Sequence, residues 1–212
     1  MTGQADLKRI VMGITGASGA PYAVRLTQCL CEAEVDVHLI VTPHGRQLLH
    51  DELGITEVSK RTLVGREDVC LTIHGYRDVG ATLGSGSFPT DGMIVCPCSG
   101  NTLAAIAAGL ADNLLHRAAA VTLKEGRRLV VVPREMPMSR IELLNALRLS
   151  EAGAIICPAS PGFYMSPHTV ADLVDFVVGK LLDLVDVPHQ LNTRWENQLQ
   201  ESRGSGSGAA NP

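Results

Sequence analysis

A chain of 212 residues, 45% of them hydrophobic and only 3% aromatic, can bury one sizeable core, so one domain is a better expectation than two. The formal net charge of −4 gives no reason to expect nucleic acid or an anionic membrane as a partner. No apolar span approaches the roughly 18 residues of a membrane helix, and residues 1–10 lack the apolar core of a signal peptide. We therefore expect a cytoplasmic protein, with a single domain over residues 1–195 and a polar tail over 196–212.

The cysteines favour the same compartment. They lie mostly in or beside apolar runs, at Cys29, Cys31, Cys70, Cys96, Cys98 and Cys157. Neither of the two closely spaced pairs has a second pair at zinc-site spacing. Because free cysteines are commonly buried in protein cores, we expect buried, reduced thiols and no metal site.

The chain opens with a predicted strand over residues 9–15 and a predicted helix over 21–31, joined by a glycine turn. The glycines are three residues apart, at Gly13, Gly16 and Gly19. This spacing differs from the G-x-G-x-x-G pattern of dinucleotide-binding proteins. The turn nevertheless lets backbone N–H groups approach a ligand closely, and it puts Ser18 at the beginning of the helix.

A second strand and helix follow. The strand over residues 37–41 ends at Thr42, and the helix over 45–53 carries Glu52. Residues 54–80 have mixed charges and no clear periodicity. We expect this segment to be irregular and solvated.

Two features ahead of the central strand are weak signals. His74 has no partner pattern in the sequence, so we expect an ordinary, satisfied histidine. Residues 84–89 form a flexible glycine-serine loop that carries Phe88. Such loops are usually plain connectors, although a loop of this kind can also cover a ligand.

The centre of the chain is an apolar strand followed by polar groups and a helix. Residues 93–96 are apolar throughout, and we expect Pro97 to end this strand because proline cannot donate to a ladder. Residues 99–102 then supply two hydroxyls and an amide, with Asn101 or Thr102 as the expected N-cap. Polar groups beside a helix N-terminus form a seat for an anionic or dipolar ligand. An ordinary loop and cap would have the same sequence.

Basic residues are concentrated in the second half of the chain, where six of the 18 lie between residues 117 and 140. Further strands are predicted over residues 129–132 and 153–157, and further helices over 139–149, with Ser139 and Glu142 spaced as a capping box, and over 169–185. We interpret Arg127, Arg128 and Arg140 as a solvated face. Arg134 directly follows a buried strand, where a guanidinium group can recognise phosphate.

The alternation of strands and helices predicts an α/β fold, a Rossmann-like or flavodoxin-like three-layer sandwich with a parallel sheet and helices on both faces. Ligands of such sheets bind outside the carboxyl ends of the strands. The polar residues expected along that edge are Ser18, Thr42, Ser99, Gly100, Asn101, Thr102, Arg134, Glu135 and Tyr164. A glycine turn, hydroxyls, helix N-termini and basic residues at one edge predict a phosphate-bearing cofactor or substrate. They do not specify a reaction.

Six short blocks occur in order along residues 8 to 188: Gly13–Gly19, Pro97–Leu103, Leu115–Ala119, Leu123–Glu125, Arg134–Pro137 and Pro161–Tyr164. Together they resemble the UbiX-like flavin prenyltransferases. The resemblance implies a Rossmann-like subunit that binds FMN and assembles into homotrimers grouped as dodecamers. It also implies metal-independent transfer of a dimethylallyl group from dimethylallyl monophosphate to N5 and then C6 of reduced FMN. The product, prenylated FMN, would serve a UbiD-type decarboxylase.

The resemblance also implies roles for individual residues. Flavin contacts are implied for Gly16, Ala17, Ser18, Thr42 (in the place of a family serine), Ser99, Gly100, Asn101 and Thr102. Arg134 would lie between the flavin and the prenyl phosphate. The implied substrate-binding set consists of Phe88, Arg117, Lys124, Arg134, Tyr164 and Lys180, and the implied catalytic set of Ser18, Glu52, Lys124 and Glu135.

These residue types suit the implied reaction. A prenyl phosphate ionises toward an allylic cation and a phosphate, so fixed cationic groups and the Tyr164 hydroxyl would stabilise the leaving group. Glu135 is the expected acid for the departing phosphate. Ser18 or Glu52 would guide the proton lost on ring closure, and the ring of Phe88 would shelter the cation.

Two positions depart from the family pattern. Lys180 stands where arginine is usual, and Ala120 where aspartate is usual after Arg-Ala-Ala. An ammonium group makes a point contact where a guanidinium makes a bidentate one, so the preferred prenyl donor could differ.

Two alternative functions stay open. The sequence also resembles the flavin-dependent cysteine decarboxylases, for which His44 or His50 would have to serve as the base. A non-catalytic FMN-binding subunit of a decarboxylase complex would share the flavin contacts and need no catalytic set.

Overall fold

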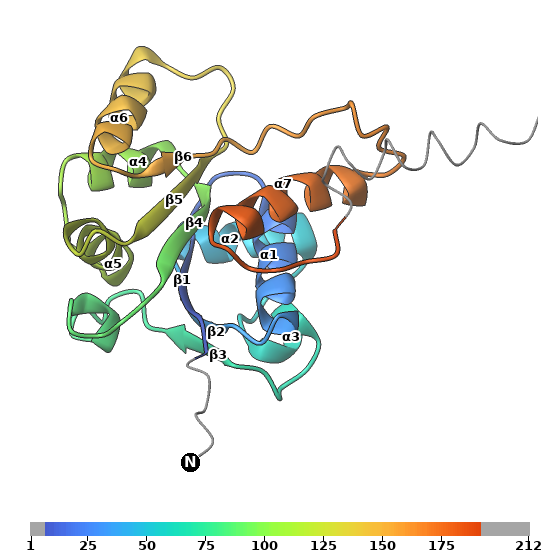
Figure 1. Ribbon diagram of the computed structural model, residues 1–212, viewed down its shortest axis with the longest axis horizontal. Helices are drawn as coiled ribbons and strands as arrows, with labels where there is room; N and C mark the ends of the chain where they lie inside the picture. Colours follow the sequence, from blue (N-terminus) through green and yellow to red (C-terminus); the bar gives the residue numbers. More distant parts are fainter. Residues whose placement is uncertain (1–6, 192–212) are drawn as a thin grey trace, which may run out of the picture.

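A six-stranded parallel sheet runs through the centre of the protein, whose computed structural model describes residues 7–191 (Figure 1). The strand order is β3-β2-β1-β4-β5-β6, and every neighbouring pair is parallel. The strands are β1 (Arg9–Ile14), β2 (Asp36–Val41), β3 (Leu71–His74), β4 (Gly92–Cys98), β5 (Arg128–Pro133) and β6 (Ile155–Ile156). This confirms the predicted α/β fold. The strand order reverses between β1 and β4, and ligands of such sheets bind at the carboxyl ends of the strands near this reversal.

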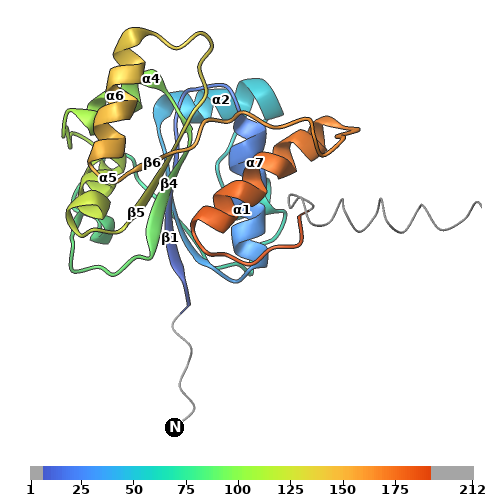
Figure 2. The same cartoon turned by 45° about the horizontal axis from the view of Figure 1, so that its top comes forward.

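Helices cover both faces of the sheet, which Figure 2 shows between its two helical layers. The helices are α1 (Ala20–Glu32), α2 (Pro43–Leu53), α3 (Lys60–Val64), the 3-10 helix η1 (Thr82–Gly84), α4 (Gly100–Ala107), α5 (Leu114–Lys124), α6 (Arg140–Glu151) and α7 (Val170–Leu184). Apolar side chains of α1, α2, α3 and α7 form the core on one face. Those of α4, α5 and α6 form the core on the other face.

Side-chain caps start most of the helices, because the first backbone N–H groups of a helix lack partners within it. The predicted capping box of Ser139 and Glu142 is confirmed at the start of α6. The predicted N-cap of α4 was wrong. Ser99, rather than Asn101 or Thr102, caps this helix by accepting a hydrogen bond from the Thr102 backbone N–H at 3.3 Å. The helix starts earlier because β4 leads into it almost directly.

The expectation that Pro97 ends the central strand was also wrong. Strand β4 continues through this residue to Cys98. Its pairing with β5 shifts register between Val95 and Cys98, so the proline lies in an irregular part of the ladder, where a missing N–H is tolerated. The Pro97 carbonyl accepts hydrogen bonds from the backbone N–H and the hydroxyl of Thr15, at 3.3 and 2.8 Å.

The segment 54–80, expected to be irregular, contains α3 and the edge strand β3. Strand β3 pairs with β2, and this pairing brings His74 beside His38. The two rings stack with centroids 5.1 Å apart, and His38 Nδ1 lies 2.9 Å from His74 Nε2. His74 is therefore a satisfied histidine, as predicted. Burial lowers the pKa of both rings.

The second half of the chain contains two further differences. Strand β6 covers only Ile155–Ile156, where a strand over 153–157 was expected, because it lies at the edge of the sheet and pairs with β5 alone. Helix α5 was not predicted as a separate helix. It begins after a break at residues 108–113 that apolar periodicity does not reveal.

All six cysteines lie within the described residues and all are free. Cys29, Cys31, Cys96 and Cys98 are buried, as expected, whereas Cys70 is exposed and Cys157 is half-buried. Burial raises the pKa of Cys29 and of Cys31 to about 11. Among residues 7–191, no helix is long and apolar enough to cross a membrane. The polar tail expected over 196–212 lies outside the described residues.

Candidate functional site

The turns after β1 and β4 are joined by one buried threonine at the carboxyl edge of the sheet. Thr15 is only 1% exposed. Its hydroxyl donates a hydrogen bond to the Pro97 carbonyl at 2.8 Å and accepts one from the Ser99 backbone N–H, also at 2.8 Å. Thr15 thereby fixes the glycine turn relative to the start of α4. Sequence reasoning did not single out this residue.

Arg134 ties the end of β5 to the same turn. Its Nε donates a hydrogen bond to the Ser18 carbonyl at 3.0 Å. These residues are 116 positions apart in the sequence, yet they lie at the same edge, as the parallel sheet predicted. The guanidinium group therefore stands beside the first residues of α1.

Tyr22 is a second residue of this edge that sequence reasoning missed. Burial and the nearby Cys96 raise the pKa of its hydroxyl, whereas the positive charge of Arg134 lowers it. A Cβ atom on Gly19 would lie 2.9 Å from the Tyr22 ring, so the ring packs directly against the glycine turn. The sequence feature that could have identified Tyr22 is a tyrosine in the first turn of a helix that begins after a glycine turn.

Glu52 caps the start of α1 from the last turn of α2. Its carboxylate accepts hydrogen bonds from the backbone N–H groups of Gly19, at 3.0 Å, and of Ala20, at 2.7 Å. Gly19 itself offers no side-chain cap. The positive end of the α1 dipole favours an anion at this position. Glu52 therefore lies directly against the glycine turn, a contact that the sequence did not predict.

The start of α2 completes this part of the edge. Thr42 is buried, and its hydroxyl accepts a hydrogen bond from the Gly45 backbone N–H at 3.0 Å. Gly16 lies close to this helix, because a Cβ atom there would be 2.5 Å from His44 Cβ. Only glycine fits at Gly16. Glycine at this position therefore lets the turn after β1 pack directly against the start of α2.

Around α4, the predicted polar residues have different environments. The Ser99 hydroxyl donates to Thr102 Oγ1 at 3.1 Å and lies inside the cap of the helix. Thr102 is buried, whereas Asn101 is exposed. A Cβ atom on Gly100 would lie 2.7 Å from a carboxylate oxygen of Glu142, which places α6 directly against this turn.

The remaining residues predicted for this edge lie after β5 and β6. Glu135 is exposed and directly follows Arg134. Tyr164 lies in the segment between β6 and α7, where its ring meets Phe176 edge to face with centroids 5.5 Å apart. On α7, the positive charge of Lys180 lowers the pKa of Cys157, which burial raises. Lys180 is therefore near the carboxyl end of β6.

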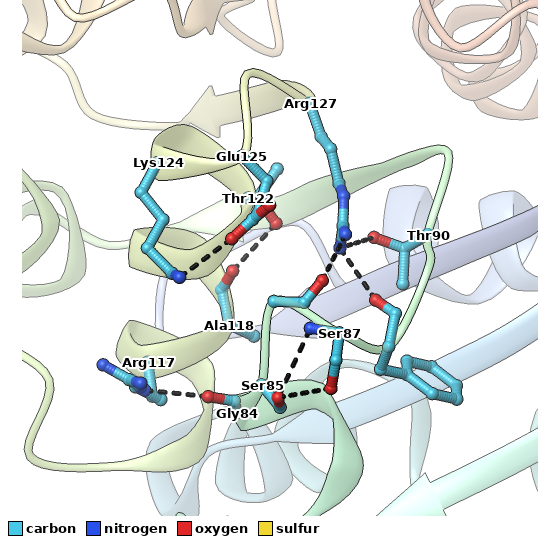
Figure 3. Close-up of polar contacts among 12 residues, drawn as sticks. Gly84, Ser85, Ser87, Thr90, Arg117, Ala118, Thr122, Lys124, Glu125 and Arg127 are labelled. Carbon is cyan, nitrogen blue, oxygen red and sulfur yellow. Dashed lines mark hydrogen bonds and ion pairs between the residues drawn. The ribbon is translucent and has the colours of Figure 1, made fainter.

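Two residues of the predicted substrate-binding set, Phe88 and Lys124, are not brought to this edge within one chain. Phe88 lies in the loop before β4, and Lys124 ends α5 shortly before β5 begins. Both therefore lie at the amino ends of the strands, because α5 runs back across the face of the sheet. Arg117 Nε, on the first turn of α5, donates to the Gly84 carbonyl of the same loop at 3.0 Å (Figure 3). The Lys124 ammonium pairs with Glu125 at 2.8 Å.

The predicted site is thus divided between two groups of residues. We call the residues at the carboxyl ends of the strands the flavin edge, after the contacts that the resemblance implied; they include Gly16, Ser18, Glu52, Ser99 and Arg134. We call Phe88 and Lys124 the amino-edge group; Arg117, in the first turn of α5, contacts the loop that precedes β4. Sequence reasoning could not separate the two groups, because it did not predict α5 and so had no direction for the helix that carries Arg117 and Lys124.

Known proteins of similar sequence identify the family to which the chain belongs. A protein-family model described as Flavoprotein matches residues 2–182. The chain is 47% identical over 188 residues to flavin prenyltransferase UbiX of Halalkalibacterium halodurans, which covers 87% of this chain and 91% of the relative. It is 41% identical over 199 residues to flavin prenyltransferase UbiX of Pseudomonas aeruginosa, covering 90% of this chain and 95% of that protein.

Solved structures agree. The crystal structure of AnUbiX (PadA1) in complex with FMN and dimethylallyl pyrophosphate superposes with a TM-score of 0.79 at 42% identity, covering 85% of this chain and 93% of that one. The dodecameric FMN-dependent UbiX-like decarboxylase from Escherichia coli O157:H7 has a TM-score of 0.80 at 46% identity, covering 88% and 98%. An FMN-dependent cysteine decarboxylase from thioviridamide biosynthesis, at 18% identity and a TM-score of 0.54, shares the fold alone. The chain belongs to the Flavoprotein family and, within it, to the UbiX flavin prenyltransferases.

Proposed function

We propose that this protein transfers a dimethylallyl group from dimethylallyl monophosphate to reduced FMN, making prenylated FMN. The observation that carries the proposal is the hydrogen bond from Arg134 Nε to the Ser18 carbonyl, at 3.0 Å. It joins the arginine expected between flavin and prenyl phosphate to the turn expected to hold the flavin. The UbiX relatives at 41–47% identity support the same reaction.

The residues of the flavin edge suit FMN. A Cβ atom at Gly16 would meet His44 Cβ at 2.5 Å, so glycine there lets the start of α2 pack directly against the turn after β1. Helices α1, α2 and α4 all start at this edge, and helix N-termini attract phosphate. The Glu52 carboxylate already accepts from the Gly19 and Ala20 N–H groups at the start of α1, so the starts of α2 and α4 are the better places for the FMN phosphate. We assign the flavin contacts to residues 16–18, Thr42, 99–102 and Arg134.

When bound, reduced FMN supplies the nucleophilic N5 and C6 atoms that accept the prenyl group. The protein's part is to stabilise the leaving phosphate, to supply its proton and to remove the proton lost on ring closure. Arg134, Lys180 and the Tyr164 hydroxyl provide fixed positive charge and a donor near the ends of β5 and β6. Glu135, directly after Arg134, protonates the phosphate. Ser18 and Glu52, on either side of the start of α1, guide the second proton.

The position of the amino-edge group requires a second copy of the chain. Phe88 and Lys124 cannot serve the flavin edge of their own chain, because they lie at the amino ends of the strands, whereas Arg134 follows the carboxyl end of β5. We therefore propose that this group faces the flavin edge of a neighbouring copy, in a homotrimer that assembles further into a dodecamer. The dodecameric relative from E. coli supports this assembly.

The destination of the product also belongs to the proposal. We propose a UbiD-type decarboxylase as its recipient and the cytoplasm as the location. Four buried, free cysteines support that location, because cytosolic thiols are kept reduced. The cysteine decarboxylase alternative retains His44 beside Gly16 as a candidate base. It lacks a use for Lys180 and Tyr164, and it has fold-level likeness only.

The decisive experiment is anaerobic incubation of the full chain with reduced FMN and either dimethylallyl monophosphate or diphosphate, followed by mass spectrometry of the flavin. A mass gain of one five-carbon prenyl unit is expected. Arg134→Ala and Lys124→Ala should each lose about 100-fold in rate, whereas Arg140→Ala, an exposed arginine at the start of α6, should keep the parental rate. An unchanged flavin with FMN bound would contradict the proposal and favour the binding subunit. Decarboxylation of a cysteine-containing peptide would favour the other alternative.

Mixing the two inactive variants tests the shared site. A mixed oligomer of Lys124→Ala and Arg134→Ala chains contains some interfaces at which both residues are intact. If the two residues act from different copies, co-expression should restore about a quarter of the parental activity, because one pairing in four joins two intact halves. No restoration in oligomers shown to be mixed would contradict a site between copies.

A further inference from the structure

The loop before β4 is held by arginine side chains, although its glycine-serine sequence predicted a flexible connector. We call residues 84–90 the arginine-bound loop. Arg127 contacts it at three points (Figure 3). Its two terminal nitrogens donate to the Gly86 carbonyl at 2.7 Å, to the Phe88 carbonyl at 2.8 Å and to the Thr90 hydroxyl at 3.3 Å. Arg127 was interpreted from sequence as part of a solvated face, but it is half-buried, and the loop covers its guanidinium group.

A second arginine fixes the same loop from the sheet. Arg9, the first residue of β1, donates to the Pro89 carbonyl at 2.9 Å. Its guanidinium carbon also lies 4.6 Å from the centre of the Phe88 ring, and its Nε pairs with Asp36 at 2.7 Å. The edge-to-face contact with His38, at 5.2 Å between centroids, holds Phe88 from another side. One face of the Phe88 ring is therefore already covered by a cation.

The loop also lies against the end of α5, where Lys124 is located. A Cβ atom on Gly86 would collide with the Glu125 carboxylate and would lie 3.0 Å from Lys124 Nζ. A shift of the loop would therefore move Phe88 and change the surroundings of Lys124 together. Among residues 7–191, Arg127 is the one side chain that binds carbonyls on both sides of Ser87.

We propose that Arg127 is a positioning residue that sets the affinity for the prenyl donor by fixing Phe88 and the loop beside Lys124. A planar guanidinium group can bind two carbonyls at once, whereas the ammonium group of lysine makes a point contact. The proposal rests on the proposed function, in which Phe88 and Lys124 of one copy meet the prenyl phosphate. It goes beyond that function because Arg127 itself touches neither flavin nor substrate. It also assigns Phe88 a role in shaping the site, since Arg9 already covers one face of the ring.

The test compares Arg127→Met and Arg127→Lys with Arg128→Met in the full-chain oligomer. Arg128 is the matched control because it is the adjacent arginine, and its side chain binds the Leu184 carbonyl and Asp186 instead of the loop. Both Arg127 variants should raise KM for dimethylallyl monophosphate about tenfold, with kcat changed less than about twofold. The Kd for FMN should stay at the parental value. Arg128→Met should match the parent in all three quantities.

Hydrogen exchange provides a readout that does not depend on turnover. In Arg127→Lys, amide exchange should increase in residues 84–90 and remain unchanged in the glycine turn after β1. An unchanged KM in both Arg127 variants would overturn the proposal. A parallel loss of kcat and FMN affinity would also overturn it, because a general loss of structure has that effect. If Arg127→Met does not fold, Arg127→Lys decides the question. A parent that makes no prenylated FMN would refute the proposed function, while exchange of the loop would still test whether Arg127 holds it.

Discussion

Thr15→Val tests whether the two turns of the flavin edge act as one unit. The substitution keeps the shape of the side chain and removes the hydroxyl that donates to the Pro97 carbonyl and accepts from the Ser99 N–H, both at 2.8 Å. Each hydrogen bond contributes about 1 kcal/mol net, and an N–H left without a partner costs about 1 kcal/mol or more. The Pro97 carbonyl keeps the backbone N–H of Thr15 at 3.3 Å, and Ser99 is only half-buried. We therefore expect a loss of about 2–3 kcal/mol in the free energy of unfolding.

Urea unfolding followed by far-UV circular dichroism measures this loss, at one protein concentration because oligomerisation contributes to stability. The midpoint should fall by about 1 M. FMN affinity, measured by calorimetric titration, should fall about tenfold, because the glycine turn and the start of α4 no longer hold each other in place. Thr122→Val is the matched control. That hydroxyl is also buried, but it donates at 2.8 Å to Ala118 within its own helix and joins no turns (Figure 3).

The control should lose less than about 1 kcal/mol and keep the parental FMN affinity. If Thr15→Val is as stable as Thr122→Val and binds FMN as tightly as the parent, the reasoning is refuted. A loss of stability with full FMN affinity would show that Thr15 supports the fold without organising the flavin edge.

Three further predictions concern other parts of the molecule. Burial lowers the pKa of His38 and His74, so the unfolded chain binds more protons than the folded chain just below the ordinary histidine pKa of about 6.5. The free energy of unfolding should therefore fall as the pH drops from about 7.5 to about 5.5. The fall should be steeper in the parent than in His38→Gln, and equal slopes in the two proteins would contradict this explanation. Gly45→Ala places a Cβ 2.5 Å from the carbonyl oxygen at the end of β1 and should cost about 2 kcal/mol or more in urea unfolding. Gly75→Ala, whose nearest neighbour would be at 3.7 Å, should cost under about 1 kcal/mol. In thiol labelling of the native protein, Cys70, which is exposed, should react first, and mass spectrometry of peptides would identify any other site that reacts as fast.

Sequence patterns were sufficient for the layered α/β fold and for much of the flavin edge. Short apolar runs alternating with helical periodicity require a parallel sheet covered on both faces, and this alone places Ser18 and Arg134 at one edge. Their contact at 3.0 Å follows from topology, because the carboxyl ends of neighbouring parallel strands lie together. The capping box of Ser139 and Glu142 was equally predictable, because its hydrogen bonds are local.

The tertiary structure decided the features that depend on long-range partners. Pro97 remains within β4 because an irregular ladder and the Thr15 hydroxyl accommodate it, and neither is visible in a window of sequence. His74 finds its partner only through the pairing of β3 with β2. Most consequentially, the direction of α5 places Lys124 at the end of the sheet opposite Arg134. A sequence motif records that these residues are present, but the path of the chain decides which of them meet within one copy.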